Sequence, residues 1–177
     1  MRKLLGGESA IFLEDGKLSL NLELCWSDVT TFEFVAKQVE AVGNEQEATT
    51  EALVKFAERL MDLYRGPLLA QEDDKPWVLG SRDRLRSQFR RLVSRLAEGL
   101  EAKSEFELAI SIYRNALERD NLSEDIYRRL MDCHQRRGEY AEGLNVYRRC
   151  RELLSVILGV QPSQQTQKLY EAIRLHA

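Results

Sequence analysis

The sequence predicts an all-α protein in which antiparallel helical hairpins stack as a right-handed superhelix, preceded by a short β-hairpin. Three observations predict this fold class. Residues 90 to 157 repeat their order of large and small side chains at a fixed offset. Apolar residues recur at helical spacing along most of the chain, and Asp15-Gly16 separates two short alternating runs near the N-terminus.

The repeat becomes clear when the chain is aligned with itself at an offset of about 34 residues. Large positions return large and small positions return small: Leu96 and Leu130, Phe106 and Tyr140, Ala109 and Gly143, Tyr113 and Tyr147, Ala116 and Cys150. A helical hairpin of the tetratricopeptide class has this length, and small residues let its two helices cross closely. Unrelated amphipathic helices whose patterns coincide by chance are the alternative.

The ends of the repeat helices carry their own signals. Leu122 and Tyr127 are spaced for a hydrophobic staple around Ser123 as the N-cap. Gly138 can adopt the left-handed conformation that ends a helix. We therefore expect a helix that begins after Ser123 and ends at Gly138.

Composition limits the class of protein. The 177 residues are 44% hydrophobic and 31% charged, as in an ordinary soluble globular chain. No apolar run approaches the ~18 residues of a membrane span, and MRKLLGGESA lacks the apolar core of a signal peptide. We expect a cytoplasmic protein without a membrane association. The net charge of -3 gives no overall attraction to nucleic acid.

The three cysteines, Cys25, Cys133 and Cys150, have no metal-binding spacing and lie in apolar contexts. We expect them to be reduced and to pack as small hydrophobic residues. A structural disulfide is not expected.

The N-terminal segment predicts a helix end followed by a β-hairpin. Met1–Leu5 resembles the tail of a helix that ends at Gly6-Gly7, so the chain is expected to begin inside a larger element. Residues 10 to 21 form the hairpin, with Asp15-Gly16 in a type I′ turn. Two interpretations of this hairpin stay open: the wing of a winged-helix domain and an ordinary surface hairpin.

Two helices follow as a further antiparallel pair. The first opens at Trp26, with Asp28 as its cap, and breaks at Gly43-Asn44. The second starts at Thr49 or Thr50 and stops at Gly66-Pro67. Residues 67 to 76 then contain prolines and an acidic run, and predict an irregular surface loop.

The longest helix is expected from Trp77 to about Glu101. Its apolar residues fall within one stripe about 100° wide, which must be buried: Val78, Leu85, Phe89, Leu92, Val93, Leu96 and Leu100. After the repeat, a helix runs past Cys150 to Leu158-Gly159. A last helix starts at Pro162-Ser163 and is expected to cap the stack.

The long helix also has the most uneven charge in the chain, with one acid, Asp83, among its arginines. The arginines are the candidate partner-docking residues: Arg82, Arg84, Arg86, Arg90, Arg91 and Arg95. They predict either a docking surface for an acidic partner or a DNA backbone, or a solvated face whose side-chain stems cover the edge of the core.

Catalytic and cofactor motifs are missing from the sequence. It has no Walker loop, no GxGxxG, no nucleophile elbow and no HExxH. His134 and His176 have no partners at metal-ligand spacing, and His134 is expected to be a satisfied core or edge histidine. Trp26 and Trp77 are expected in the core. We therefore expect no enzyme activity, no cofactor and no metal site.

Short motifs from about Cys25 to the C-terminus together carry a family resemblance. They are Trp26-Ser27-Asp28 with Phe32, Tyr64-Arg65-Gly66-Pro67-Leu68-Leu69, Trp77-Val78 with Arg84-Leu85, Leu130-Met131 with Gly138 and Tyr147, and Leu158-Gly159-Val160-Gln161-Pro162-Ser163 with Leu169-Tyr170. With these motifs the chain resembles the bacterial transcriptional activator domain of regulators of the antibiotic-regulatory-protein (SARP) type. Two positions depart from the pattern: Asp120-Asn121 stands where the repeat often has proline, and Gly143 where it often has alanine.

The resemblance implies a bundle of tetratricopeptide-type hairpins over residues 25–177 that follows an OmpR-like winged-helix DNA-binding domain. Residues 1–24 are similar to the end of that domain, namely a helix end and the β-hairpin wing. The DNA-reading helix would lie before Met1. DNA contact is therefore expected only through the N-terminal winged-helix domain.

The function that the resemblance implies is that of a protein-interaction and regulatory domain of a bacterial transcriptional activator. Its expected partner is a protein, either RNA polymerase or a second protomer in a homodimer. A generic peptide-binding scaffold is the first alternative, since helical-repeat surfaces receive peptide segments. Direct nucleic-acid contact through the helix from Arg82 to Arg95 is the second, and it predicts a steep salt dependence.

Overall fold

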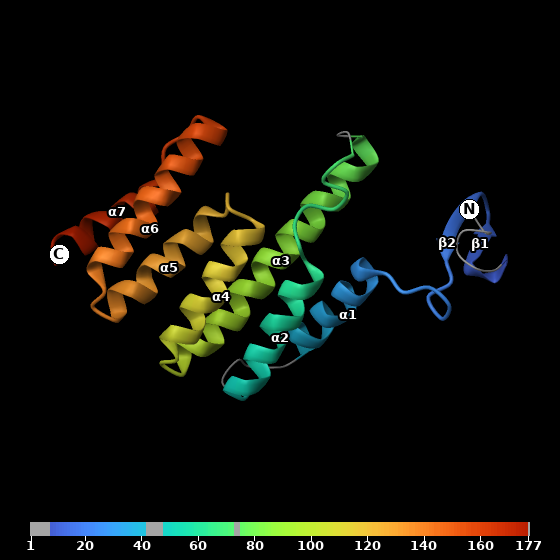
Figure 1. The fold of residues 1–177 in the computed structure, drawn as a ribbon, viewed down its shortest axis with the longest axis horizontal. Helices are drawn as coiled ribbons and strands as arrows, with labels where there is room; N and C mark the ends of the chain where they lie inside the picture. Colours follow the sequence, from blue (N-terminus) through green and yellow to red (C-terminus); the bar gives the residue numbers. More distant parts are fainter. Residues whose placement is uncertain (1–7, 42–47, 73–74, 177) are drawn as a thin grey trace.

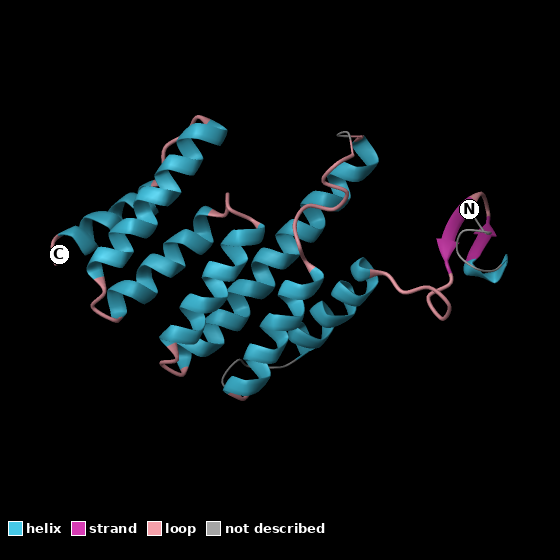
Figure 2. Ribbon diagram, viewed as in Figure 1, coloured by secondary structure: helices cyan, strands magenta, loops and turns pink. Residues whose placement is uncertain are grey.

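The computed structural model of the chain describes residues 8–41, 48–72 and 75–176. Its elements in order are a 3₁₀ turn (Glu8–Ala10), β1 (Ile11–Glu14), β2 (Lys17–Leu20), α1 (Asp28–Ala41), α2 (Thr50–Leu63), α3 (Pro76–Ala102), α4 (Phe106–Arg119), α5 (Glu124–Arg136), α6 (Tyr140–Leu153), the π-helical turn η3 (Leu154–Leu158) and α7 (Gln164–Arg174). Figure 2 shows that the described chain is helical apart from the N-terminal hairpin and the connecting loops.

The helices form a stack of antiparallel hairpins, α1–α2, α3–α4 and α5–α6, which α7 closes (Figure 1). Each helix packs on the next one in the chain. The first helices of successive hairpins also contact one another, α1 with α3, α3 with α5, and α5 with α7. The predicted all-α fold of stacked hairpins is therefore confirmed.

The buried face of α3 matches the predicted apolar stripe, since all seven residues predicted for that stripe are buried. Aromatic rings fill the spaces between hairpins: Tyr64 stacks on Phe89 and Tyr147 on Tyr170, each at a centroid distance of 4.1 Å. The resulting core runs continuously from α1 to η3, and a smaller cluster lies between α5, α6 and α7.

The small positions of the repeat lie where helices approach closely. Ala109, Ala116 and Cys150 are fully buried. At Gly143, a Cβ atom would lie only 3.1 Å from Cδ1 of Ile173, a residue of α7. The last helix thus packs directly on the Gly143 backbone, which explains why the repeat has glycine rather than alanine here.

Several predicted helix ends are confirmed. The Thr49 and Ser163 side chains accept hydrogen bonds from the backbone N–H groups of Ala52 and Thr166 and so cap α2 and α7. Gly138 has a φ of 73° after α5. Ser123 is the N-cap of α5, but its side chain makes no capping hydrogen bond.

The N-terminal hairpin is also present as predicted. Ile11 pairs with Leu20 and Glu14 with Lys17 in antiparallel register. Asp15 and Gly16 have φ angles of 50° and 74°, which the type I′ turn requires. Figure 1 shows the hairpin beyond the α1 end of the stack.

Three details of the predicted elements differ in the structure. α1 begins at Asp28 rather than Trp26, because the Ser27 carbonyl accepts the first helical hydrogen bond, from the backbone N–H of Thr31. Asp28 is therefore the first helical residue and not the predicted cap. Both tryptophans were wrongly placed in the core: Trp26 is 76% exposed and Trp77 is 66% exposed. Each precedes or opens a helix at a point where no neighbouring helix covers it.

The predicted helix end at Gly6-Gly7 and the break at Gly43-Asn44 lie outside the described residues. Within the described residues, none of the helices combines the length and the apolar character needed to cross a membrane.

Candidate partner-docking surface

The six candidate arginines lie along α3, and the structure shows what each guanidinium contacts. Two of them link α3 to α1: Arg84 pairs with Glu33 and Arg91 with Glu40, each at 2.6 Å between nitrogen and oxygen. All four side chains are well exposed, so each pair contributes at most about 1 kcal/mol to stability. The apolar core therefore holds α1 beside α3, and these pairs add little to it.

Arg86 and Arg90 converge on one buried carboxylate. Asp120, just after α4, has a side chain that is only 4% exposed, and it accepts hydrogen bonds from both guanidinium groups. Arg86 donates through Nε and Nη2, with Nη2 at 2.6 Å from Oδ1. Burial opposes ionisation of this carboxyl, but the two arginines outweigh burial and lower the pKa of Asp120 below its usual 3.8.

Arg82 holds the loop between α2 and α3. Its guanidinium donates to the backbone carbonyls of Leu68 at 2.6 Å, of Leu69, and of Glu72 at 3.1 Å. Leu69 has a φ of 50°, unusual for a leucine, so the loop backbone needs such a restraint. Arg95, the last of the six, also interacts within the chain.

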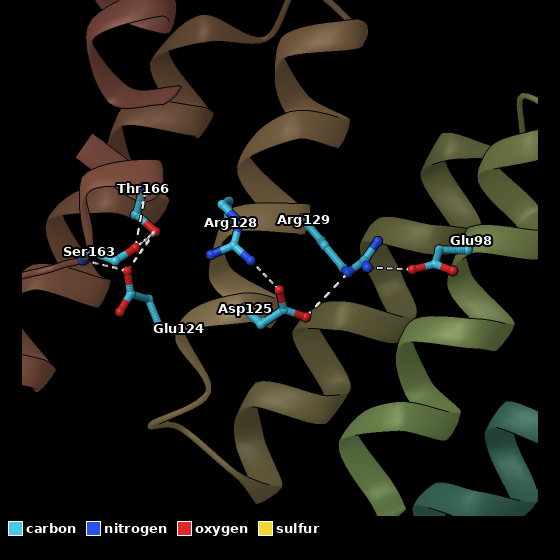
Figure 3. Close-up of polar contacts among 7 residues, drawn as sticks. All are labelled: Glu98, Glu124, Asp125, Arg128, Arg129, Ser163 and Thr166. Atoms are coloured by element: carbon cyan, nitrogen blue, oxygen red, sulfur yellow. Dashed lines mark hydrogen bonds and ion pairs between the residues drawn. The ribbon is translucent and has the colours of Figure 1, made fainter. Parts of the chain in front are cut away.

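Beside these arginines, polar contacts link α5 to α3 and, as a separate set, α5 to α7 (Figure 3). Arg129 of α5 pairs with Glu98 of α3 at 2.5 Å and with Asp125 at 3.3 Å, while Asp125 also pairs with Arg128. A hollow of about 630 Å³ lies here, lined by residues of α3 and of the start of α5. Its charges already have partners in the chain, either within the hollow, as Arg129 with Glu98, or outside it, as Arg90 with Asp120.

Glu124 links α5 to the last helix through hydrogen bonds of its own. Its Oε1 accepts hydrogen bonds from the backbone N–H of Ser163 at 2.7 Å and from the Thr166 hydroxyl at 2.6 Å (Figure 3). Burial raises the pKa of Glu124, but these hydrogen bonds outweigh it and the pKa lies below its usual 4.5. One carboxylate of α5 thus holds the N-terminus of α7.

His134 is a satisfied core histidine, as predicted. It is 2% exposed. Its Nδ1 lies 2.7 Å from Oε2 of Glu139, and its Nε2 lies 3.5 Å from Nη2 of Arg114. In the part of the chain that the structure describes, no group of three or more His, Cys, Asp or Glu side chains is placed to hold a metal ion. The cysteines of that part are free thiols, and burial raises the pKa of Cys150 to about 12.

A second hollow lies at the α1 end of the stack. It has a volume of about 600 Å³ and is lined mainly by apolar side chains, among them Trp26, Phe32, Tyr64, Leu68 and Leu85. The loop that Arg82 holds forms one wall. Exposed Trp26, from the segment before α1, also lines the hollow.

The sequence located the arginines but not their acceptors. Glu33, Glu40 and Asp120 come from α1 and from the end of α4, far from α3 along the chain. They lie 30 to 51 residues from the arginines along the chain, too far for a local helical spacing to relate them. Only the hairpin topology, once known, brings these elements together.

Comparisons with known proteins agree with this architecture. The bacterial transcriptional activator domain matches residues 27–174. No curated protein sequence matches the chain. Among solved structures, the chain is similar to Mycobacterium tuberculosis EmbR in complex with a low affinity phosphopeptide, with 21% identity and a TM-score of 0.63 over 98% of this chain and 47% of that one. The chain thus spans about half of the EmbR chain.

A second similar structure is the TPR2B domain of yeast Sti1 in a complex with pHsp70, with 17% identity and a TM-score of 0.51 over 85% of this chain and 98% of that one. At these identities both likenesses show the fold, a tetratricopeptide-like stack of hairpins. The match over residues 27–174 covers all the described helices of this stack. The chain therefore belongs to the bacterial transcriptional activator domain family, a family of regulatory domains and not of enzymes.

Proposed function

We propose that this chain is the part of a transcriptional activator that binds another protein, either a second protomer or the transcription machinery. One observation carries the proposal: the family match covers the whole stack of helices. A stack of hairpins exposes long continuous surfaces, and such surfaces suit protein segments.

The similar structures support binding of protein segments in general. The EmbR structure contains a phosphopeptide, and the Sti1 domain is in a complex with pHsp70. A peptide-binding scaffold outside transcription is therefore the second candidate function. The coding sequence upstream of Met1 separates the two, since a winged-helix domain there supports the activator.

We also propose that residues 1–24 are the end of a winged-helix DNA-binding domain. The hairpin supports this, because Leu13, Leu18 and Leu20 are 45–66% exposed on it and Ile11 and Leu20 are paired across the strands. A two-stranded hairpin of this kind is not stable alone and needs another element on its apolar face.

The six arginines of α3 stay a candidate docking surface, for an acidic protein segment or for nucleic acid. Docking through them requires exchange of the bonds that they make to Glu33, Glu40, Asp120 and the loop carbonyls. An acidic partner would therefore have to bind the arginines more strongly than these acceptors already do.

A reporter assay tests the proposed function. It compares activation by the gene product as encoded with activation by a version that lacks residues 25–177. We expect activation to fall to the background level without these residues. Unchanged activation would contradict the proposal.

A further inference from the structure

The turn after α6 carries an aliphatic surface that the described fold leaves uncovered. Val156, Ile157, Leu158 and Val160, here called the tip patch, are 78%, 50%, 53% and 47% exposed. Figure 1 shows that α6 and this turn extend beyond the neighbouring ends of α4 and α5. Contiguous exposed aliphatic residues of this kind are characteristic of interaction sites.

The backbone of the turn has an unusual form. Residues Leu154–Leu158 are π-helical, and Gly159 ends the turn with a φ of 68°. Leu154 is buried, and an α-helical continuation would carry Ile157 and Leu158 on the same face as Leu154. The wider turn is rare, and such turns are frequent at functional sites.

Basic side chains flank the tip patch. Arg148, Arg149 and Arg151 lie on the last turns of α6 and are exposed, with Glu152 as the one acid beside them. Among the described residues, these three arginines form no ion pair; Arg148 instead donates to the Asn145 amide oxygen at 2.8 Å. The arginines of α3, in contrast, are engaged within the chain.

Apolar and basic groups share one hollow at this tip. Its volume is about 530 Å³, and its lining includes Val156 together with Arg148, Arg151 and the acid Glu152, so that the basic groups outnumber the acidic one. An occupant that fits both must offer apolar groups to the tip patch and negative charge to the guanidinium groups.

We propose that the tip patch, with Arg148 and Arg151, binds an acidic amphipathic helix of a partner protein. This inference rests on the proposed function, and it names the surface and the chemistry of the partner. Leucine-like side chains of the helix would cover the tip patch, and its carboxylates would pair with the two arginines. A second copy of this chain fits less well, because a symmetric contact would bring the arginines of both copies together.

Two synthetic peptides of about 18 residues, long enough to form a helix, test the proposal. One carries leucines on one face and glutamates on the other; the second has lysines in place of the glutamates. Calorimetric titration of the full chain should show the acidic peptide binding at least tenfold more tightly. Val156→Glu should weaken that binding at least tenfold, and Arg148→Glu with Arg151→Glu should reverse the preference between the peptides.

Leu175→Glu is the matched control, because Leu175 is 81% exposed but lies outside the tip patch. It should leave peptide binding unchanged. Equal binding of the two peptides, or no effect of Val156→Glu, would overturn the proposal. So would Val156-dependent binding to phosphatidylglycerol vesicles in place of the peptides, or Val156-dependent dimerisation in sedimentation.

The peptide titration and the reporter assay can fail independently. Loss of activation without residues 25–177, together with failed peptide binding, overturns the tip patch and keeps the proposed function. Unchanged activation in the reporter assay overturns the proposed function whatever the peptides do.

Discussion

At the scale of single residues, Asp120 is a side chain held by two arginines. In the sequence it is only a departure from the proline of the usual repeat. In the structure it is a buried carboxylate between Arg86 and Arg90, two arginines that project from α3. A buried charge is tolerated only with such partners, so Asp120 sets the distance between α3 and the end of α4.

Replacing Asp120 with Asn should lower the free energy of unfolding by about 2 to 3 kcal/mol. The loss is below the ~3–5 kcal/mol of a fully buried pair, because both arginines are about one-third exposed. Urea denaturation at neutral pH measures it. Asp83→Asn is the control, since Asp83 is exposed on the same helix and its loss should cost less than about 0.5 kcal/mol.

The pH dependence of stability in wild type and Asp120→Asn gives an independent check. The pKa of Asp120 is lower in the folded protein than its ordinary value of 3.8. Its contribution is therefore complete above that value and is lost as the pH falls through the folded pKa. The stability difference between wild type and Asp120→Asn should shrink below about pH 4. A difference that stays constant down to pH 2 would contradict this role.

At the scale of helices and turns, local signals predicted the ends well where a single residue determines the backbone. Gly138 and Thr49 act as predicted, since a left-handed φ or a capping oxygen depends on one residue. Trp26 and Trp77 were not placed correctly, since both were expected in the core and both are exposed. Their burial depends on whether a neighbouring helix reaches them, and that depends on how far each helix extends beyond the stack.

The small positions of the repeat provide a test at this scale. Ala109 is fully buried where α4 packs on its neighbours, whereas Ala141 is exposed on α6. Ala109→Leu should cost about 1 to 3 kcal/mol because the contact is already filled. Ala141→Leu should change stability by less than about 0.5 kcal/mol. Equal shifts of the denaturation midpoint would show that the 34-residue register is wrong.

At the scale of the whole molecule, the sequence predicted the stack because part of its signal repeats: the same large and small positions recur in the α3–α4 and α5–α6 hairpins, and α1 and α2 have apolar residues at helical spacing. The candidate site was less predictable. Arg84 and Arg91 are ordinary surface arginines in the sequence, and only the arrangement of α1 beside α3 provides Glu33 and Glu40 as partners. An arginine-rich helix can therefore serve the stack itself, while the arginines of α6 have no such carboxylate partner among the residues that the structure describes.

Because each helix packs only on near neighbours, stability should be distributed along the stack rather than shared equally. In such a chain the loss of a terminal unit weakens the adjoining unit most. α7 covers α5 and α6, with Ile173 fully buried against Gly143 and Glu124 bonded to its N-terminus. Its removal would expose Met131 and Tyr147, the other members of that apolar cluster.

A version that ends at Gln161 should therefore open locally at α5 and α6 while α1 and α2 keep their protection. Hydrogen exchange with mass spectrometry measures this, because amide protection reports the free energy of local opening. We expect exchange to become at least tenfold faster in α6, and less than twofold faster in α1 and α2. Equal acceleration along the whole chain would instead show that the stack unfolds as one cooperative unit, and that α7 stabilises its distant end as strongly as its neighbours.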